Sequence, residues 1–326
     1  MTPLYGHDDA VTSFRAALDS GRLHHAWLIT GPEGIGKGLF ARKAALRVLA
    51  QGQGPVARPG LEVPDEHQAV RLMAAGSHPD FVQLERLTKE GGTELARNIN
   101  IAQVRGLQRL FATTATYSPW RAVVVDAVDD LEAAGANALL KSLEEPPAHT
   151  VFLLVSHAPE RLLPTIRSRC RLLRLAPLGP ADMAAALAIA VPEAGPGEIA
   201  ELVAAGQGSP GRAAAARGLD VAALDSAMRT IAGTGDPTNR HRSALAQSLA
   251  GKAAQPRFEA FLDRAPSFIA AAARERKGLA LADALTLWER ATELSRIAVR
   301  QSFDPQSTAF EMGTIIAGLA APAARP

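Results

Sequence analysis

A strand–helix–strand unit in the middle of the chain constrains the fold more than any other stretch. Two apolar runs, Arg121–Asp126 and Thr150–Ser156, flank the segment NALLKSLEEPP at Asn137–Pro147. Leucines and alanines recur at helical spacing up to its two prolines, which end the helix because proline has no amide hydrogen to donate. So short a connection between two buried strands predicts a parallel crossover, in which the helix covers one face of a sheet.

A glycine-rich loop near the N-terminus predicts a second strand-to-helix turn. Gly31–Gly38 reads GPEGIGKG and follows a short apolar strand, His25–Thr30. It matches the G-x-x-x-x-G-K pattern of a phosphate-binding loop, whose amides curl toward an anion at the start of the next helix. Lys37 could reach a phosphate, but Gly38 stands where a serine or threonine hydroxyl would hold Mg²⁺. Two interpretations stay open: a loop that binds phosphate, and a loop kept only as a tight turn.

The composition of the 326 residues predicts two or three globular domains. The net charge of +2 argues against a large basic field and against tight, autonomous DNA binding. We expect no membrane span, because no run of about 18 apolar residues is present, and no signal peptide, because the first residues lack an apolar core. The single cysteine, Cys170, excludes an internal disulfide and fits a reducing cytoplasm.

Two motifs together resemble one protein family. NALLKSLEEPP, followed by Ser-Arg-Cys at Ser168–Cys170, is similar to the signature of clamp-loader AAA+ subunits in bacterial DNA polymerase III and eukaryotic replication factor C. Within that family, the details below resemble the delta prime subunits. The resemblance covers Leu23–Arg212 by motif and the remainder by helical content. It implies an α/β P-loop AAA+ domain with a parallel sheet flanked by helices, then a small helical lid and an all-α C-terminal collar domain.

From Pro177 onward the chain is rich in alanine and predicts helices without strands. We expect short helices at Pro180–Ile189, Pro196–Ala205 and Ser209–Ala216, and longer ones at Arg240–Ala250, Arg257–Arg276, Leu281–Ser302 and Thr308–Ala320. The expected domains are residues 1–177 (RecA-like nucleotide-binding type), 178–233 (lid) and 239–326 (oligomerisation collar). Thr234–Thr238, which reads TGDPT, is the expected linker, and Trp288, Phe258 and Phe261 are predicted core residues of the collar.

The strand that ends at Asp126 stands in the place of the metal-associated strand of a P-loop protein. Asp126 could hold a magnesium-bound water, but the next residue, usually glutamate in hydrolysing AAA+ proteins, is Ala127. A methyl group cannot orient the attacking water, and Gly38 offers no hydroxyl to the metal. Asp129 and Asp130, which we expect to cap the start of the next helix, are poorly placed to replace the base. We predict negligible intrinsic ATP hydrolysis and no required cofactor, while ATP binding without turnover stays open.

The resemblance gives Arg169 the role of an arginine finger that acts in trans. In the family, this arginine projects into the ATP site of the neighbouring subunit, where its permanently charged guanidinium can bind phosphate oxygens. Such a finger is worth about 10³–10⁵ in rate in other phosphoryl-transfer systems. The alternative is a solvated or DNA-facing basic patch of Arg167, Arg169 and Arg171. Cys170 is predicted to be a small buried residue rather than a nucleophile.

Three further positions match the family by place, and each has a structural alternative. Ser156–His157 stands at the sensor 1 place, or simply ends a strand. Arg212 stands at the sensor 2 place, or lies on the surface at a helix start. Arg105, on the amphipathic helix Ile99–Leu110, matches a family arginine or is solvated. The phosphate contacts that the resemblance implies, in a degenerate nucleotide site, are Gly31, Gly34, Gly36, Lys37, Asp126 and Arg212.

The interval 51–77 departs from the family pattern. Many delta prime and gamma-type subunits hold a four-cysteine zinc module there, whereas this interval contains no cysteine. His67 and His78 alone cannot complete a tetrahedral zinc site, so we expect no zinc and a module that is absent or replaced by a metal-free insertion. After it, His78–Leu84 is predicted to be a strand.

Two functions follow from these observations. The resemblance implies a clamp-loader subunit, part of the polymerase III holoenzyme, that supplies Arg169 to a neighbouring gamma/tau ATPase without hydrolysing ATP itself. Its implied partners are the gamma/tau and delta subunits and, through the complex, the sliding clamp and primer–template DNA. The alternative is a catalytically active gamma/tau-like ATPase subunit. A free-standing DNA-binding protein is disfavoured by the near-neutral charge.

Overall fold

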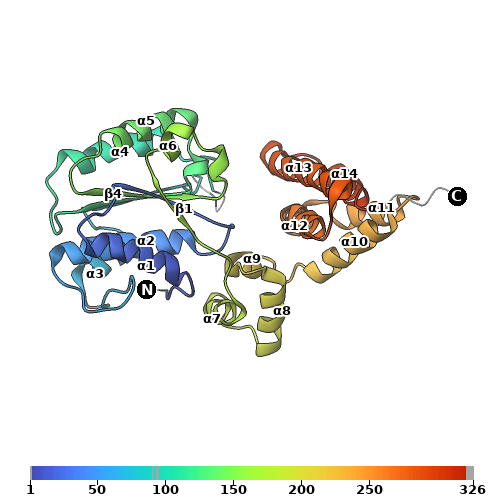
Figure 1. The fold of residues 1–326 in the computed structure, drawn as a ribbon, viewed down its shortest axis with the longest axis horizontal. Coiled ribbons are helices and arrows are strands. Elements are labelled where there is room, and N and C mark those ends of the chain that lie inside the picture. The colour runs from blue at the N-terminus through green and yellow to red at the C-terminus, as the bar shows by residue number, and fades with distance from the viewer. Residues whose placement is uncertain (1, 90–91, 93–94, 321–326) are drawn as a thin grey trace. The chain divides into compact units, whose positions relative to one another are not determined.

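Five parallel strands form the centre of the first of two compact units, Met1–Ala214 (Figure 1). The structure is a computed structural model, and it describes residues 2–89, 92 and 95–320. The strands are β1 (Ala26–Thr30), β2 (Phe81–Glu85), β3 (Arg121–Asp126), β4 (Thr150–Ser156) and β5 (Arg171–Arg174), in the order β2-β3-β4-β1-β5. Because β3 and β4 are parallel neighbours, with Val124 opposite Leu153, the predicted crossover is confirmed.

Helices cover both faces of this sheet (Figure 1). The helical elements of the unit are α1 (Asp8–Asp19), α2 (Lys37–Gln53), α3 (Gln68–Ala74), α4 (Ile101–Ala112), η1 (Val128–Asp130), α5 (Ala133–Glu144), η2 (Pro159–Arg161), α6 (Pro164–Arg167), α7 (Pro180–Ala190), α8 (Pro196–Gly206) and α9 (Pro210–Ala215). Within β1, Trp27 packs in one cluster with Phe40 of α2, while Leu28 packs on the other face with Leu139 of α5. Two-sided burial explains why the central strands are apolar throughout rather than alternating. The predicted α/β P-loop class is confirmed.

The start of α5 differs from the prediction. The helix begins at Ala133, and its N-cap residue, Glu132, makes no side-chain cap hydrogen bond. Asp129 and Asp130 lie before it in the short 3₁₀ helix η1, so the prediction that they cap α5 is wrong. The physical reason is that both carboxylates have partners elsewhere at this edge of the sheet, which are described below.

In the second compact unit, Ala215–Pro326, the described residues form helices and connecting loops and no strand. Its elements are α10 (Val221–Thr234), α11 (Arg240–Ser248), η3 (Lys252–Ala254), α12 (Gln255–Arg274), α13 (Gly278–Gln301) and α14 (Pro305–Ala317). The four longer helices that we expected are confirmed to within a few residues at each end. No described helix, here or in the first unit, is long and apolar enough to cross a membrane.

The core of the second unit includes a helix that was not predicted. Leu224 and Met228 of α10 are buried with Phe258 and Phe261 of α12, although α10 lies in the range expected for the lid. The core role predicted for the two phenylalanines is confirmed. The one predicted for Trp288 is wrong, because this residue is 38% exposed on α13.

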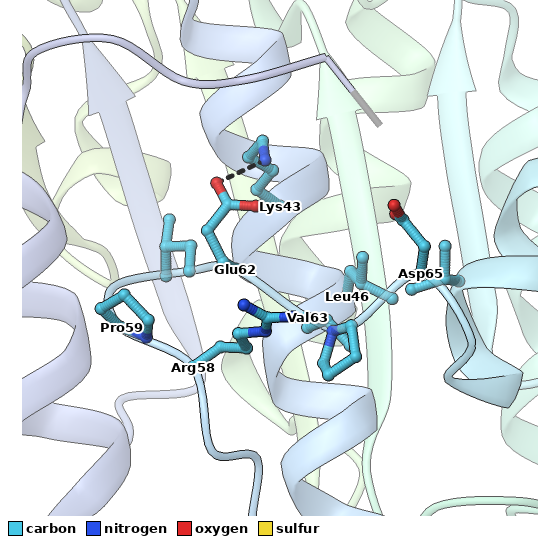
Figure 2. Close-up of a pocket in the computed structure, with 10 residues that line it drawn as sticks. Lys43, Leu46, Arg58, Pro59, Glu62, Val63 and Asp65 are labelled. Carbon is cyan, nitrogen blue, oxygen red and sulfur yellow. Dashed lines mark hydrogen bonds and ion pairs between the residues drawn. The ribbon is translucent and has the colours of Figure 1, made fainter.

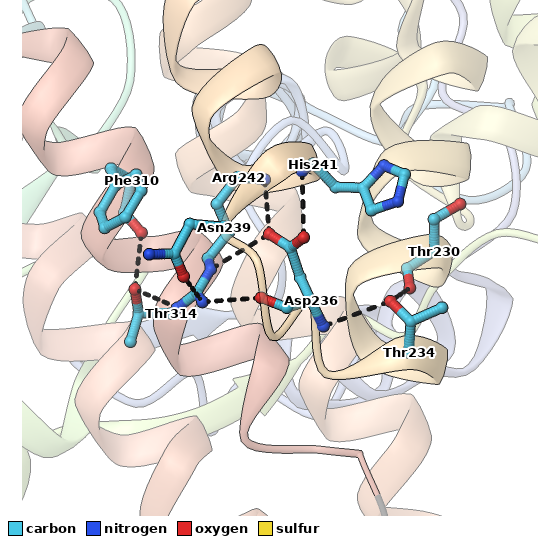
Figure 3. A network of polar contacts seen from close by, with 8 residues as sticks. All are labelled: Thr230, Thr234, Asp236, Asn239, His241, Arg242, Phe310 and Thr314. Carbon is cyan, nitrogen blue, oxygen red and sulfur yellow. Dashed lines mark hydrogen bonds and ion pairs between the residues drawn. The ribbon is translucent and has the colours of Figure 1, made fainter.

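Thr234–Thr238 is a corner anchored by one buried side chain, Asp236, which is 1% exposed, while Thr234, Pro237 and Thr238 are exposed (Figure 3). The Asp236 carboxylate accepts hydrogen bonds from the amides of His241 and Arg242, at 3.1 and 2.9 Å, and from Arg242 Nε at 3.2 Å. Arg242 Nη1 in turn donates to Thr314 Oγ1 of α14 at 2.9 Å. The corner therefore joins α10 to α11 within one core. The three-domain boundaries that we expected stay a prediction.

Candidate functional site

The loop between β1 and α2 has the backbone of a phosphate-binding loop. Gly31, Gly34 and Gly36 have φ values of 145°, 73° and 106°, which residues with a side chain rarely adopt. Lys37 begins α2, and its Nζ donates to the carbonyls of Gly31 and Pro32, both at 2.7 Å. The residue is only 3% exposed, and burial lowers the pKa of Lys37 to about 8. The ammonium group therefore closes the loop on itself.

Asp126 lies directly against the helix that follows this loop. A β-carbon added to Gly38 would overlap Asp126 Oδ2, so the carboxylate fills the space that a serine or threonine side chain would need. Burial raises the pKa of the Asp126 carboxyl group. The sequence analysis counted two losses, the missing hydroxyl at Gly38 and the missing glutamate at Ala127. The structure gives Gly38 a packing reason, because a glycine at this position leaves room for the Asp126 carboxylate.

The other two acids of this region hold the backbone and a neighbouring arginine. Asp129 accepts hydrogen bonds from Ser156 Oγ at 3.0 Å and from the amides of His157 and Ala158 at 2.8 and 3.3 Å. Arg86 Nε lies 3.2 Å from the Asp130 carboxylate. Ser156, at the expected sensor 1 place, therefore directs its hydroxyl to Asp129. Neither acid stands as a free base beside the loop.

The start of α9 is attached to the glycine loop. Ser209 Oγ donates to the carbonyl of Glu33 at 2.7 Å, and the amide of Gly211 donates to the carbonyl of Gly34 at 2.9 Å. A β-carbon on Gly34 would come within 2.7 Å of the Arg212 amide, so the fit requires glycine. The backbone of Arg212 thus lies against the loop, and its sensor 2 role stays a prediction. No pattern in the sequence indicated that Ser209 makes this contact.

Arg169 lies in a different environment, after α6 and beside the end of α5. Its Nη2 is 2.9 Å from Glu144 Oε1, and its Nη1 donates to the carbonyl of Thr165 at 2.9 Å and lies 3.5 Å from Ser168 Oγ. The Arg169 side chain is 34% exposed. None of these partners belongs to the glycine loop, so Arg169 and Lys37 are not brought together. Sequence reasoning missed Glu144, although it lies in the segment NALLKSLEEPP.

The neighbours of Arg169 bear on the alternative of a basic patch. The Arg171 guanidinium lies over the Trp27 ring, 4.7 Å from its centroid, while Arg167 is exposed.

Cys170 is half-buried, and burial raises the pKa of its thiol to about 12, which disfavours a nucleophilic thiolate. Arg105 is exposed on α4, which leaves both of its interpretations open.

The cysteine-free interval 51–77 is organised by side chains of α2 (Figure 2). Arg47, 1% exposed, donates to the carbonyls of Val56, Arg58 and Glu62. The Lys43 ammonium, also buried, lies 2.7 Å from Glu62 Oε1, at the edge of a cavity of about 320 Å³. His67 caps α3. In the described part of the chain, no group of three or more His, Cys, Asp or Glu side chains could hold a metal ion. The expected absence of zinc stays a prediction.

Comparison with known proteins places this geometry in a family. Residues 6–179 match the family model described as DNA polymerase III, delta subunit. The chain is 40% identical over 187 residues to DNA polymerase III subunit delta' of Pseudomonas aeruginosa. This alignment covers 57% of this chain and 53% of that protein. It is 37% identical over 183 residues to DNA polymerase III subunit gamma/tau of Mycobacterium bovis. This second alignment covers 56% of this chain and 30% of that protein.

A solved structure of a gamma subunit-related protein from Thermotoga maritima aligns with a TM-score of 0.44 at 16% identity, over 95% of this chain and 99% of that chain. The chain spans about half the length of the delta' relative from Pseudomonas. The family model covers more than half of the chain, Gly6 to Gly179. The chain therefore belongs to the DNA polymerase III delta subunit family.

Proposed function

We propose that the chain acts as a delta prime-type subunit of a DNA polymerase III clamp loader, which supplies an arginine to a neighbouring ATPase and does not hydrolyse ATP itself. The observation that carries the proposal is the contrast between its two cationic side chains. Lys37 is buried on its own loop, whereas Arg169 is partly exposed and lies away from that loop.

Three features support the absence of hydrolysis in the chain's own site. Two donors of Lys37 are committed to loop carbonyls, Gly38 offers no hydroxyl to a metal, and Ala127 cannot orient water. The residues present thus do not fit a magnesium–ATP site as it stands. Binding of nucleotide without turnover would first require Lys37 to leave Gly31 and Pro32.

The family membership supports the partners. The relatives bear the names of DNA polymerase III subunits delta' and gamma/tau. We therefore propose the gamma/tau and delta subunits as direct partners, with the sliding clamp and primer–template DNA contacted through the complex, in the cytoplasm. Arg169 would act by placing its guanidinium against phosphate oxygens of the nucleotide bound by a gamma/tau neighbour.

Reconstitution with gamma/tau and delta subunits tests the proposal. Arg169→Ala should lower the clamp- and DNA-stimulated ATPase, by about 10³ or more at the site that the finger completes, because a trans arginine stabilises charge in the transition state. Arg167→Ala, which removes an exposed arginine from the same corner, is the matched control and should change the rate little. Assembly, followed by gel filtration, should survive both changes. An unchanged rate in Arg169→Ala contradicts the finger role.

A second candidate is an active gamma/tau-like ATPase. The 37% identity to a gamma/tau subunit over 183 residues favours it. In that case the isolated chain would hydrolyse ATP, and Lys37→Met would abolish the activity.

A further inference from the structure

The guanidinium group of Arg169 already has hydrogen-bonding partners within its own chain. Glu144, the last residue of α5, places Oε1 2.9 Å from Arg169 Nη2. Nη1 donates to the carbonyl of Thr165 at 2.9 Å. Both terminal nitrogens of the guanidinium therefore have partners before any other subunit is present.

Glu144 lies at the C-terminal end of α5, where the helix does not stabilise a carboxylate. The last turn of a helix carries partial negative charge, which disfavours acidic side chains there. Even so, α5 ends with Glu144 followed by Glu145, and the two prolines that follow fix the position of this end. The ion pair with Arg169 offsets the unfavourable position of Glu144. The pairing with Arg169 therefore explains why a glutamate stands at position 144, which the stability of α5 alone does not explain.

The ion pair is weak enough to be exchanged for another partner. The side chains of Arg169 and Glu144 are 34% and 43% exposed, and pairs so exposed shift an equilibrium by about five-fold at most. Phosphate oxygens offer more negative charge than a carboxylate and match the planar guanidinium in a bidentate geometry.

We propose that Glu144 is the resting partner of Arg169 and gives up the guanidinium when the triphosphate of a neighbouring subunit's nucleotide takes its place. The inference rests on the proposed function and adds its regulation. Glu144 opposes engagement of the finger, so the neighbouring site is completed only when a triphosphate outcompetes the carboxylate. A negative charge so close to the guanidinium also keeps Arg169 from binding weaker anions.

The variants Glu144→Gln and Glu145→Gln form a matched pair for the test. Each removes one negative charge from the same helix end, and of the two glutamates Glu144 is the one paired with Arg169. In the isolated, nitrogen-15-labelled chain, Glu144→Gln should shift the NMR signals of the Arg169 guanidinium, which Arg169→Lys identifies by their loss. Glu145→Gln should leave them in place. Unchanged signals in Glu144→Gln overturn the pairing.

The reconstituted complex tests the competition. At limiting ATP, Glu144→Gln should raise the ATPase rate about two- to five-fold, Glu145→Gln should leave it unchanged, and Glu144→Gln with Arg169→Ala should match Arg169→Ala alone. A lower rate in Glu144→Gln, or an equal rise in Glu145→Gln, overturns the inference. If Arg169→Ala alone has no effect, the proposed function fails. If Arg169→Ala lowers the rate and Glu144→Gln does not raise it, only the resting role of Glu144 fails.

Discussion

The glycine loop and the Ser-Arg-Cys corner each present a cation after a strand–turn or strand–helix connection, yet they use it differently. Lys37 is 3% exposed and donates to two carbonyls of its own loop. Arg169 keeps 34% of its side chain exposed and is held mainly by a half-exposed carboxylate. The buried Lys37 is held by carbonyls of its own loop, whereas the exposed Arg169 can exchange its carboxylate partner for another anion. Four stability measurements can break or sharpen this comparison.

The largest effect is expected for Lys37, through pH. Burial lowers its folded-state pKa to about 8, against 10.5 in the unfolded chain. Between these values the unfolded state binds the extra proton, so the free energy of unfolding should rise with pH, by up to about 3 kcal/mol across the window. Urea denaturation of the wild type and Lys37→Met at pH 7, 8.5 and 10 isolates this contribution. A stability difference that does not change over this range would contradict the lowered pKa of Lys37 in the folded state.

The next effect concerns the contact between Gly38 and Asp126. Gly38→Ala should destabilise the chain by about 1–3 kcal/mol, because the added methyl group meets the Asp126 carboxylate. In an Asp126→Ala background the same change should instead stabilise α2 by about 0.5–1 kcal/mol. Gly106→Ala is the matched control, since a β-carbon there meets nothing within 4 Å. The double-mutant cycle measures the coupling, and additive changes would show that Asp126 does not fill this space.

A smaller effect is expected where α9 is attached to the glycine loop. Ser209→Ala removes the hydrogen bond to the Glu33 carbonyl from a residue that is 1% exposed, and should cost about 1 kcal/mol or somewhat more. Ser168→Ala removes an exposed hydroxyl that bonds the Thr165 carbonyl, and should cost less than about 0.5 kcal/mol. Thermal or urea denaturation compares the two. Equal losses would argue that the α9 contact contributes no special stability.

The smallest effect is expected for Arg169 itself. Because its ion pair is exposed, Arg169→Ala should change the free energy of unfolding of the isolated chain by less than about 1 kcal/mol. The same variant is expected to have a large effect on the reconstituted ATPase. A loss of several kcal/mol on denaturation would instead identify Arg169 as a structural residue.

The sequence predicted best what depends on local pattern. Apolar runs and glycine spacing located four of the five strands, the loop at Gly31–Gly38 and the parallel crossover, because two-sided burial and positive φ leave local signatures. The short strand β5 was not predicted. It failed where distant segments compete for one side chain. Asp129 looked like a helix cap, but it holds Ser156, and Asp236 looked like part of a linker, but it anchors Arg242.

Two contacts of the site had no signal in the pattern of residue types. Ser209 reaches a carbonyl 176 residues earlier in the chain, and Glu144 pairs with an arginine that follows the next strand. Both depend on how α5, α6 and α9 are placed by tertiary packing. The sequence therefore predicted the glycine loop and Arg169. It did not predict Ser209 and Glu144, the residues that contact them.

The central claim is that the chain's own P-loop does not turn over ATP. Steady-state hydrolysis by the purified chain alone, measured beside Lys37→Met, tests it most directly. The account predicts that both proteins give the same rate, at the background of the assay, while the wild-type chain still supports the ATPase of a reconstituted complex. Rapid hydrolysis by the wild-type chain that Lys37→Met abolishes would contradict it.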